Sequence, residues 1–196
     1  MTELFTAPFL RVEQPRRGPA ARTRYRVLDD AGTVLAVAAE TGERSRAETL
    51  KTVFPGKSGI DARAVLLTDP GGAPLLIVDK AAGRTLITLR APDGAVLGTY
   101  TARHAGRRFA LRDAEDRPVG ALDGDLSRRN FTVTDPSGAT AGTIRKRFAG
   151  VATHLLTTAD KYDVTIGADV AEPLRTFVVA GAIAMDLALH EAKEVT

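Results

Sequence analysis

The sequence has no cysteine and no tryptophan, and its aromatic residues are limited to seven phenylalanines and three tyrosines. Without cysteine the chain cannot form disulfides or thiolate metal sites, which is typical of a protein from a reducing compartment. So few aromatic side chains argue against a stacking platform for single-stranded nucleic acid. The first residues, Met1–Leu10, lack the basic segment and apolar run of a signal peptide, so we expect a cytoplasmic protein.

The charge of the chain is small overall but unevenly distributed. The net charge is +3 for 196 residues; residues 101–150 carry 10 Lys or Arg against 6 Asp or Glu, and residues 151–196 carry 3 against 7. A net charge this small does not indicate nucleic-acid binding, so we expect no nucleic-acid partner. The basic middle of the chain instead predicts a surface with one basic side.

An internal repeat organises most of the chain, because four segments align without gaps at a spacing of 22 residues and a fifth precedes them. The five segments are Tyr25–Gly32, Val65–Gly72, Ile87–Gly94, Phe109–Asp116 and Phe131–Gly138. Each alternates apolar and variable residues and then enters a four-residue turn, which predicts a β-hairpin. A series of such hairpins favours a meandering antiparallel barrel, because closure removes the exposed strand edges.

The returning strands carry a column of small residues. The aligned positions are Leu76, Gly98, Gly120 and Gly142, followed two residues later by Val78, Tyr100, Leu122 and Ile144. A glycine beside a large apolar residue leaves room for another element to approach the sheet closely. The strand pattern resumes on both sides of the polar stretch Thr41–Arg63, where we expect a long loop with a helical turn around Arg46–Val53. We therefore expect a single domain over residues 1–196.

One long helix is expected, from Glu172 to His190, with Asp169 as its N-cap and Pro173 in its first turn. The segment is apolar on all sides, as in a helix buried in a core or in a membrane. A membrane span needs about 20 apolar residues, whereas the longest run here, Phe177–Met185, ends at Asp186. We therefore predict a buried core helix that packs against the glycine column. Burial requires a partner for Asp186, either a backbone group or an arginine.

The hairpins and the final helix resemble the tubby C-terminal-like superfamily, in particular the LURP-one-related proteins and the phospholipid scramblases. The resemblance extends over residues 8–190 and is carried by Thr158–Ile166, Asp169, Gly142–Lys146 and the helix Leu174–Leu189 with its embedded Met185-Asp186. It implies a mainly β fold, an antiparallel barrel of about twelve strands wrapped around a C-terminal hydrophobic helix. It also implies a role with lipids, because tubby domains bind phosphoinositides and scramblases translocate phospholipids. Scramblases have a cysteine-rich palmitoylated segment that this chain lacks, so we expect no acyl anchor.

Three groups of basic residues are candidates for an anion-binding site. They are Arg103, Arg107 and Arg108; Arg128 and Arg129; and Arg145, Lys146 and Arg147. Hairpin loops that recur every 22 residues return to the same end of a barrel, where these groups can converge. A converged patch would hold a phosphorylated headgroup through bidentate arginine contacts. The alternative is that the side chains are solvated loop residues.

Calcium is implied only by the resemblance, since scramblases have a proposed calcium segment where this chain has Asp160, Asp163, Asp169 and Glu172. Calcium binds six to eight oxygen atoms, often from one acidic loop, whereas a strand pattern interrupts these four carboxylates. The alternative is that they are strand-end and helix-capping carboxylates. We expect no other metal and no cofactor.

The sequence favours a non-enzymatic module that binds anionic phospholipid or phosphorylated headgroups through its basic loops. No paired carboxylates, metal cluster or nucleophile–base set indicates an enzyme. One alternative is a scramblase-like membrane protein with Leu174–Leu189 inserted into the bilayer. Another is a scaffold domain that contacts a protein partner through Thr41–Arg63 and has no lipid role. We expect a cytoplasmic protein that associates peripherally with the membrane surface.

Overall fold

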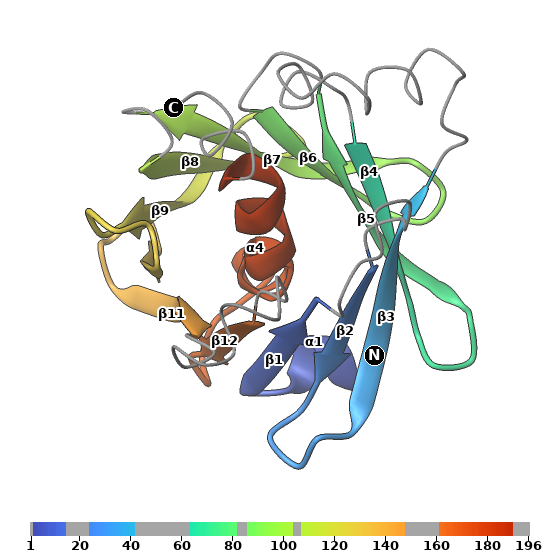
Figure 1. Ribbon diagram of the computed structural model, residues 1–196. Coiled ribbons are helices and arrows are strands. Elements are labelled where there is room, and N and C mark those ends of the chain that lie inside the picture. Colours follow the sequence, from blue (N-terminus) through green and yellow to red (C-terminus); the bar gives the residue numbers. More distant parts are fainter. Residues whose placement is uncertain are drawn as a thin grey trace, which may run out of the picture.

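The fold is a closed barrel of twelve antiparallel strands around one helix (Figure 1). The computed structural model describes residues 2–14, 24–41, 63–81, 86–103, 107–147 and 161–189. Each strand from β1 to β12 pairs with its neighbour in sequence, and β1 closes the barrel by pairing with β12. The mainly β fold and the barrel wrapped around a C-terminal helix, both predicted from the sequence, are confirmed.

The described elements follow one another around the barrel. They are α1 (Glu3–Thr6), β1 (Phe9–Glu13), β2 (Arg24–Leu28), β3 (Val34–Thr41), β4 (Arg63–Thr68), β5 (Pro74–Lys80), β6 (Leu86–Arg90), β7 (Val96–Arg103), β8 (Arg108–Asp113), β9 (Pro118–Gly124), β10 (Asn130–Thr134), β11 (Thr140–Arg147), β12 (Lys161–Ile166) and α4 (Leu174–Leu189). The predicted loop Thr41–Arg63 and its helical turn around Arg46–Val53 lie outside the described residues, apart from the two end residues.

The 22-residue repeat forms five hairpins of one design. Their strand pairs are β2–β3, β4–β5, β6–β7, β8–β9 and β10–β11. In four of the turns an aspartate carboxylate accepts a hydrogen bond from the backbone N–H four residues later, as Asp69 does from Ala73 at 2.8 Å. Each hairpin also has a register shift near its turn. Such bulges increase the local twist, which helps the sheet to curl into a barrel.

The glycine column faces α4 and lets the barrel wall approach the helix, as predicted. A Cβ atom added to Gly98 would lie 2.5 Å from Cζ of Phe177, and one added to Gly142 would lie 2.7 Å from Cγ1 of Val178. Helix α4 is buried continuously from Phe177 to Ala188. The glycines have no side chains at these points of the barrel wall, and this allows the apolar helix to fill the barrel.

The beginning of α4 differs from the prediction. The helix begins at Leu174 rather than at Glu172, and Asp169 is exposed in the preceding turn instead of capping the helix. Glu172 acts as the cap, because its Oε2 accepts hydrogen bonds from the backbone N–H of Thr176 at 3.1 Å and from its hydroxyl at 2.8 Å. A carboxylate at this position also suits the positive end of the helix dipole.

Two side chains tie the first turns of α4 to the barrel. The Arg175 guanidinium donates hydrogen bonds to the carbonyl oxygens of Thr6 at 2.9 Å and Ala7 at 3.1 Å, at the end of α1. The hydroxyl of Tyr100 on β7 donates a hydrogen bond to the carbonyl oxygen of Phe177 at 2.5 Å, and burial raises the pKa of Tyr100 well above its usual range. Helix α1 and the wall therefore both hold α4 in place.

Asp186, the carboxylate of α4, is buried near the opposite end of the helix. The hydroxyls of Tyr25 and Tyr162 donate hydrogen bonds to its two oxygens at 2.6 Å and 2.9 Å. The sequence led us to expect a backbone group or an arginine, and these two tyrosines were not foreseen. They come from β2 and β12, the strands on either side of β1, so Asp186 ties the helix to the closing seam of the barrel.

We expect Gly142→Ala to lower the free energy of unfolding by about 1–3 kcal/mol, because the added methyl group overpacks the core. It would lie 2.6 Å from the carbonyl oxygen of Thr165 and 2.7 Å from Val178. Urea unfolding followed by circular dichroism measures the change. Gly71→Ala is the matched control, because its Cβ would meet only the Asp69 side chain, at 3.3 Å. A Gly142→Ala protein as stable as the wild type would contradict the close fit of wall and helix.

Candidate functional site

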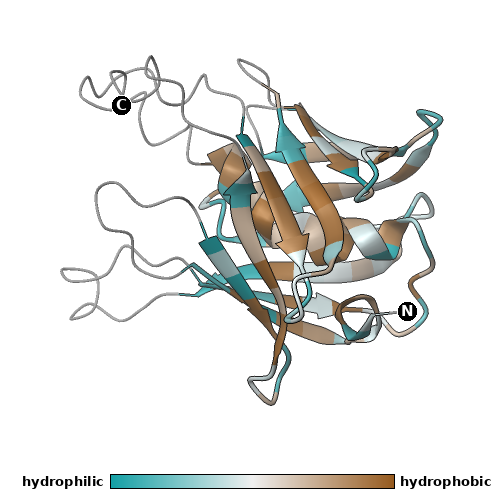
Figure 2. Cartoon of the chain, turned by 90° about the vertical axis from the view of Figure 1, so that its right-hand side faces the viewer, coloured by the Kyte–Doolittle hydropathy of each residue, from teal (hydrophilic) through white to brown (hydrophobic). Residues whose placement is uncertain are grey.

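The two ends of the barrel differ in character. The five repeat turns and α1 lie at one end, where α4 begins, and α4 runs towards the other end, which we call the rim. Figure 2 shows the tight turns on the right and polar residues on strand ends at the left. All five hairpins have their turns at the same end of the barrel, so their open ends point to the rim. The eight basic residues predicted from the sequence are in or near these open ends and the connections between hairpins, and therefore lie at or next to the rim.

Arg103, Arg107 and Arg108 lie at the rim ends of β7 and β8. Arg103 and Arg108 are direct cross-strand neighbours. Arg108 forms an ion pair with Asp123 on β9, whose hydrogen bond and negative charge raise the pKa of the guanidinium. Arg103 and Arg107 are exposed and form no ion pair with any described residue. These two cations are therefore available to an external anion.

The turn between β9 and β10 carries Arg128 and Arg129 and is organised by Asp125. The Asp125 carboxylate accepts hydrogen bonds from the Ser127 hydroxyl at 2.9 Å, the Arg129 backbone N–H at 2.9 Å and the Asn130 amide at 2.6 Å. Desolvation raises the pKa of Asp125, but these hydrogen bonds outweigh it and lower the pKa to about 2. The carboxylate is thus ionised and engaged within the turn.

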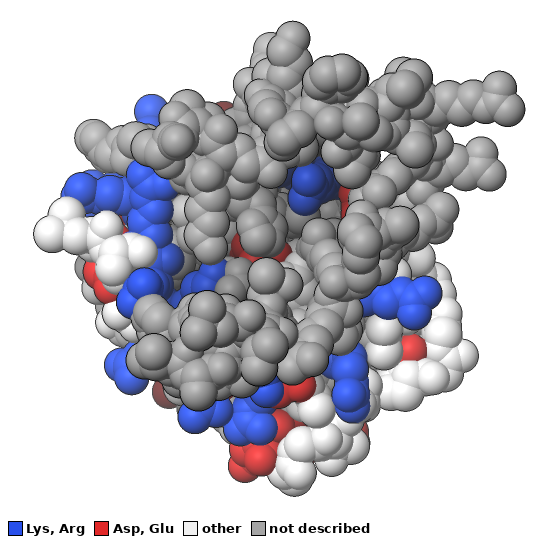
Figure 3. Space-filling model, viewed as in Figure 1, with Lys and Arg blue, Asp and Glu red and all other residues white. Residues whose placement is uncertain are grey.

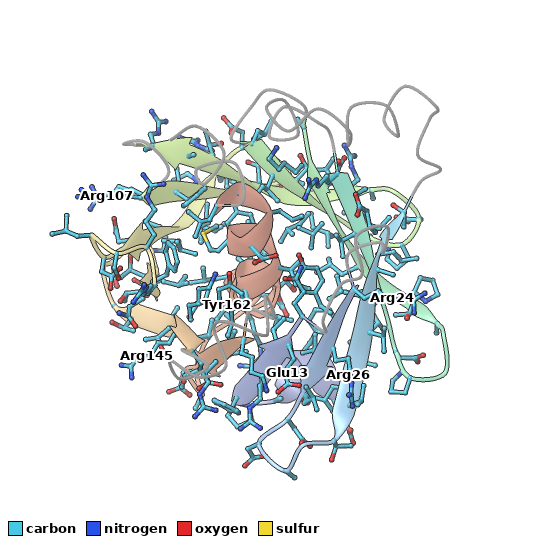
Figure 4. The ribbon with its side chains drawn as sticks, in the orientation of Figure 1. Glu13, Arg24, Arg26, Arg107, Arg145 and Tyr162 are labelled. Atoms are coloured by element: carbon cyan, nitrogen blue, oxygen red, sulfur yellow. The ribbon has the colours of Figure 1, made fainter. Side chains whose placement is uncertain are left out.

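Arg145, Lys146 and Arg147 do not act as one group, because side chains alternate between the two faces of β11. Arg145 and Arg147 are exposed on the outer face. Lys146 faces inward, and its Nζ lies 5.4 Å from the centre of the Tyr162 ring. The hydroxyl of Tyr162 in turn donates a hydrogen bond to Asp186. In Figure 4, Tyr162 lies inside the barrel beside α4, whereas Arg145 points outward. Lys146 therefore belongs to the interior and not to the outer basic surface.

Barrel closure adds four basic residues that were not among the candidates predicted from the sequence. They are Arg11 on β1, Arg24 and Arg26 on β2, and Lys161 on β12. The pairing of β1 with β12 and with β2 continues the outer surface from β11 across β12 and β1 to β2, and Lys161 lies directly opposite Arg147. The alternation of basic residues at Arg24 and Arg26 was the available signal, since it marks the outer face of a strand.

Together these residues form a basic arc along the outside of the barrel, from β7 through β11 and β12 to β2. Its members are Arg103, Arg107, Arg108, Arg128, Arg129, Arg145, Arg147, Lys161, Arg11, Arg26 and Arg24. Figure 3 shows Lys and Arg side chains on the left and along the bottom of the visible face. Figure 4 places Arg107, Arg145, Arg26 and Arg24 around the outline of the barrel.

Acidic residues neutralise only part of the basic arc. Lys161 pairs with Glu13 at 2.9 Å, and Arg147 pairs with Asp163 at 3.2 Å. Six arginines form no ion pair with any described residue: Arg24, Arg26, Arg103, Arg107, Arg128 and Arg145. Anions can bind to any of these six guanidinium groups without first breaking an ion pair to a described residue.

The acidic residues considered for calcium serve other purposes where the structure describes them. Asp163 lies between arginines of the basic arc, with Arg147 at 3.2 Å. Glu172 caps α4, and Asp169 is exposed in the turn before the helix. Asp160 lies outside the described residues. Over the described ranges, no three His, Cys, Asp or Glu side chains are grouped so that they could hold a metal ion.

Helix α4 is the segment that the membrane-protein alternative inserts into the bilayer. In the structure its apolar surface is buried in the barrel. In the parts of the chain that the structure describes, no helix combines the length and the apolar character needed to cross a membrane. The protein-contact alternative through Thr41–Arg63 concerns a segment outside the described residues, its two ends excepted.

We expect Asp125→Asn to lower the free energy of unfolding by about 1 kcal/mol at neutral pH, allowing for solvent screening of this partly exposed group. The folded-state pKa of about 2 lies below the usual 3.8, so the ionised carboxylate stabilises the fold above pH 3.8 and this contribution is lost as the pH falls towards 2. Urea unfolding at a series of pH values should therefore show the wild type and the variant converging in acid. A difference that stays constant from neutral pH to acid would contradict this role.

Comparison with known proteins agrees with this architecture. Among solved structures, the chain is similar to an X-ray structure of a protein from Arabidopsis thaliana, with 14% sequence identity, a TM-score of 0.57 and coverage of 93% of this chain and 94% of that chain. At this identity the likeness shows a shared fold. No curated protein matches the chain. The sequence model of the Scramblase family matches residues 75–192, which is more than half of the 196 residues, and the protein therefore belongs to the Scramblase family.

Proposed function

We propose that this protein is a non-enzymatic module that binds anionic phospholipid headgroups at a membrane surface through the basic arc. The observation that carries the proposal is the set of six arginines that form no ion pair with any described residue, contributed by separate strands and turns. Arginine suits this role because its planar guanidinium group donates paired hydrogen bonds to phosphate oxygens. Membership of the Scramblase family supports a ligand from the same chemical class.

The spacing of the charges also supports an external anion. Arg103 lies directly opposite Arg108, and Arg147 lies directly opposite Lys161. Like charges in such cross-strand positions destabilise a sheet by about 0.2–1 kcal/mol for each pair. Asp123, Asp163 and Glu13 already neutralise Arg108, Arg147 and Lys161. A headgroup phosphate would therefore add attraction chiefly at Arg103, which forms no ion pair with any described residue.

The expected contact lies on the outside of the barrel, because α4 fills the inside. Each basic residue close to an anionic membrane contributes about 1 kcal/mol. The attraction extends about 8 Å at physiological ionic strength, so it requires the arc to approach the headgroups closely. Binding through the arc is therefore expected to be strongly salt-dependent and independent of calcium.

We expect the protein to co-sediment with mixed phosphatidylcholine–phosphatidylserine vesicles at low salt and to be released as salt is added. The triple variant Arg107→Gln, Arg128→Gln, Arg145→Gln should lower the partition coefficient about 100-fold, because it removes three cations of the basic arc. The assay is run with calcium and with a chelator, and the two conditions should agree.

The matched control is Arg90→Gln, Arg112→Gln, Arg117→Gln, which removes the same charge near the repeat turns at the opposite end. These three arginines pair with Asp79, Asp116 and Asp113, and exposed pairs of this kind contribute little to stability. The control should bind like the wild type. Equal losses in both triple variants would show that net charge alone drives binding, and a wild type that stays in the supernatant at low salt would contradict the lipid-binding proposal.

A further inference from the structure

An exposed leucine lies within the basic arc. Leu126, in the turn between β9 and β10, is 85% exposed, whereas the next most exposed large apolar residues among those described are Val96 at 39% and Val37 at 37%. Single apolar residues on a surface are common and need no explanation by themselves. The surroundings of Leu126 are what distinguish it.

The turn that carries Leu126 is held in one conformation by hydrogen bonds. The Asp125 carboxylate accepts three hydrogen bonds from the residues that follow Leu126 in the turn. The Arg128 backbone N–H also donates to the carbonyl oxygen of Asp125 at 3.0 Å. Arg128 adopts a positive φ of 54°, a conformation that few residues other than glycine take up readily. A turn fixed in this way presents Leu126 without further ordering, which lowers the entropic cost of making a contact.

Cations surround the base of this turn. Arg128 and Arg129 follow Leu126 by two and three residues, and the carbonyl oxygen of Arg107 accepts a hydrogen bond from the Gly124 backbone N–H at 2.7 Å. Arg107 therefore lies beside the strand end from which the turn projects. An apolar tip flanked by basic side chains matches the two layers of an anionic bilayer, with phosphates at the surface and acyl chains beneath them.

We infer that Leu126 is a membrane anchor, which inserts into an anionic bilayer while Arg107, Arg128 and Arg129 contact the phosphates around it. The inference rests on the proposed lipid binding and adds its orientation: the turn between β9 and β10 is the part of the rim that enters the membrane. The charge of the flanking residues selects an anionic bilayer over an uncharged apolar partner.

The absence of tryptophan from the chain makes the inference directly measurable. Leu126→Trp introduces a single fluorophore at the anchor, and Val96→Trp places the same fluorophore in an exposed position beside a turn at the opposite end. On phosphatidylcholine–phosphatidylserine vesicles, the emission of Leu126→Trp should shift to shorter wavelength and be quenched by lipids with brominated acyl chains. The emission of Val96→Trp should not change.

The outcomes separate this inference from the lipid-binding proposal. A Leu126→Trp protein that co-sediments with the vesicles while its emission stays unchanged would overturn the anchor and leave lipid binding intact. A protein that does not co-sediment at all would overturn both. If Val96→Trp shifts instead, the molecule binds by its opposite end and the anchor is wrong.

An affinity measurement provides a second readout. Leu126→Ser should weaken partitioning onto the same vesicles about tenfold, because the buried apolar side chain is lost. The fold reduction should persist when salt is added, whereas that of the arginine variant should shrink because salt screens charges. Val96→Ser is the matched control and should bind like the wild type. A Leu126→Ser protein that binds as tightly as the wild type would contradict the inference.

Discussion

The need to bury an apolar helix inside a closed barrel explains the other main features of this fold. Helix α4 has no polar face to expose, so the twelve strands must surround it completely, and the β1–β12 pairing provides the closure. Glycines such as Gly98 and Gly142 make the wall thin enough for the helix to fit. The carboxylate of Asp186, held by Tyr25 and Tyr162, then joins the helix to the strands on both sides of the seam.

This packing determines where a ligand can bind. The interior is filled by α4, and α1 and the five repeat turns occupy one end of the barrel. The outer surface near the rim remains, and there the alternation of strand residues directs arginines outward from β2, β7 and β11. The fold thus separates an apolar interior, which provides stability, from a basic exterior whose cations are only partly neutralised. In the proposed binding mode, the barrel keeps its helix and approaches an anionic membrane as a rigid body, with the turn of Leu126 foremost.

Much of the fold was readable from the sequence because the 22-residue repeat is local: each hairpin is specified by its own alternation and turn. The close packing of α4 against the glycine column was also predicted correctly, because both the glycines and the apolar helix are visible in the sequence. The closed barrel was also predicted, but the strand pairing at its seam was not. This pairing brings Arg11 and Arg26, which lie far from β11 in the chain, onto the strands that follow β12 around the barrel. The orientation of Lys146 depends on strand register, and the exposure of Leu126 depends on a turn outside the repeat. The binding residues therefore remain predictions that rest on their position.

We propose that the protein contacts lipid from outside while α4 stays in the barrel. Hydrogen–deuterium exchange of the backbone amides of α4, with and without anionic vesicles, tests it directly. Amides in the middle of a buried helix exchange only when large parts of the protein unfold. We expect equally strong protection from Val178 to Met185 in the free and the vesicle-bound protein, with new protection confined to the rim. A loss of protection along α4 on binding would contradict it, because it would mean that the helix leaves the barrel.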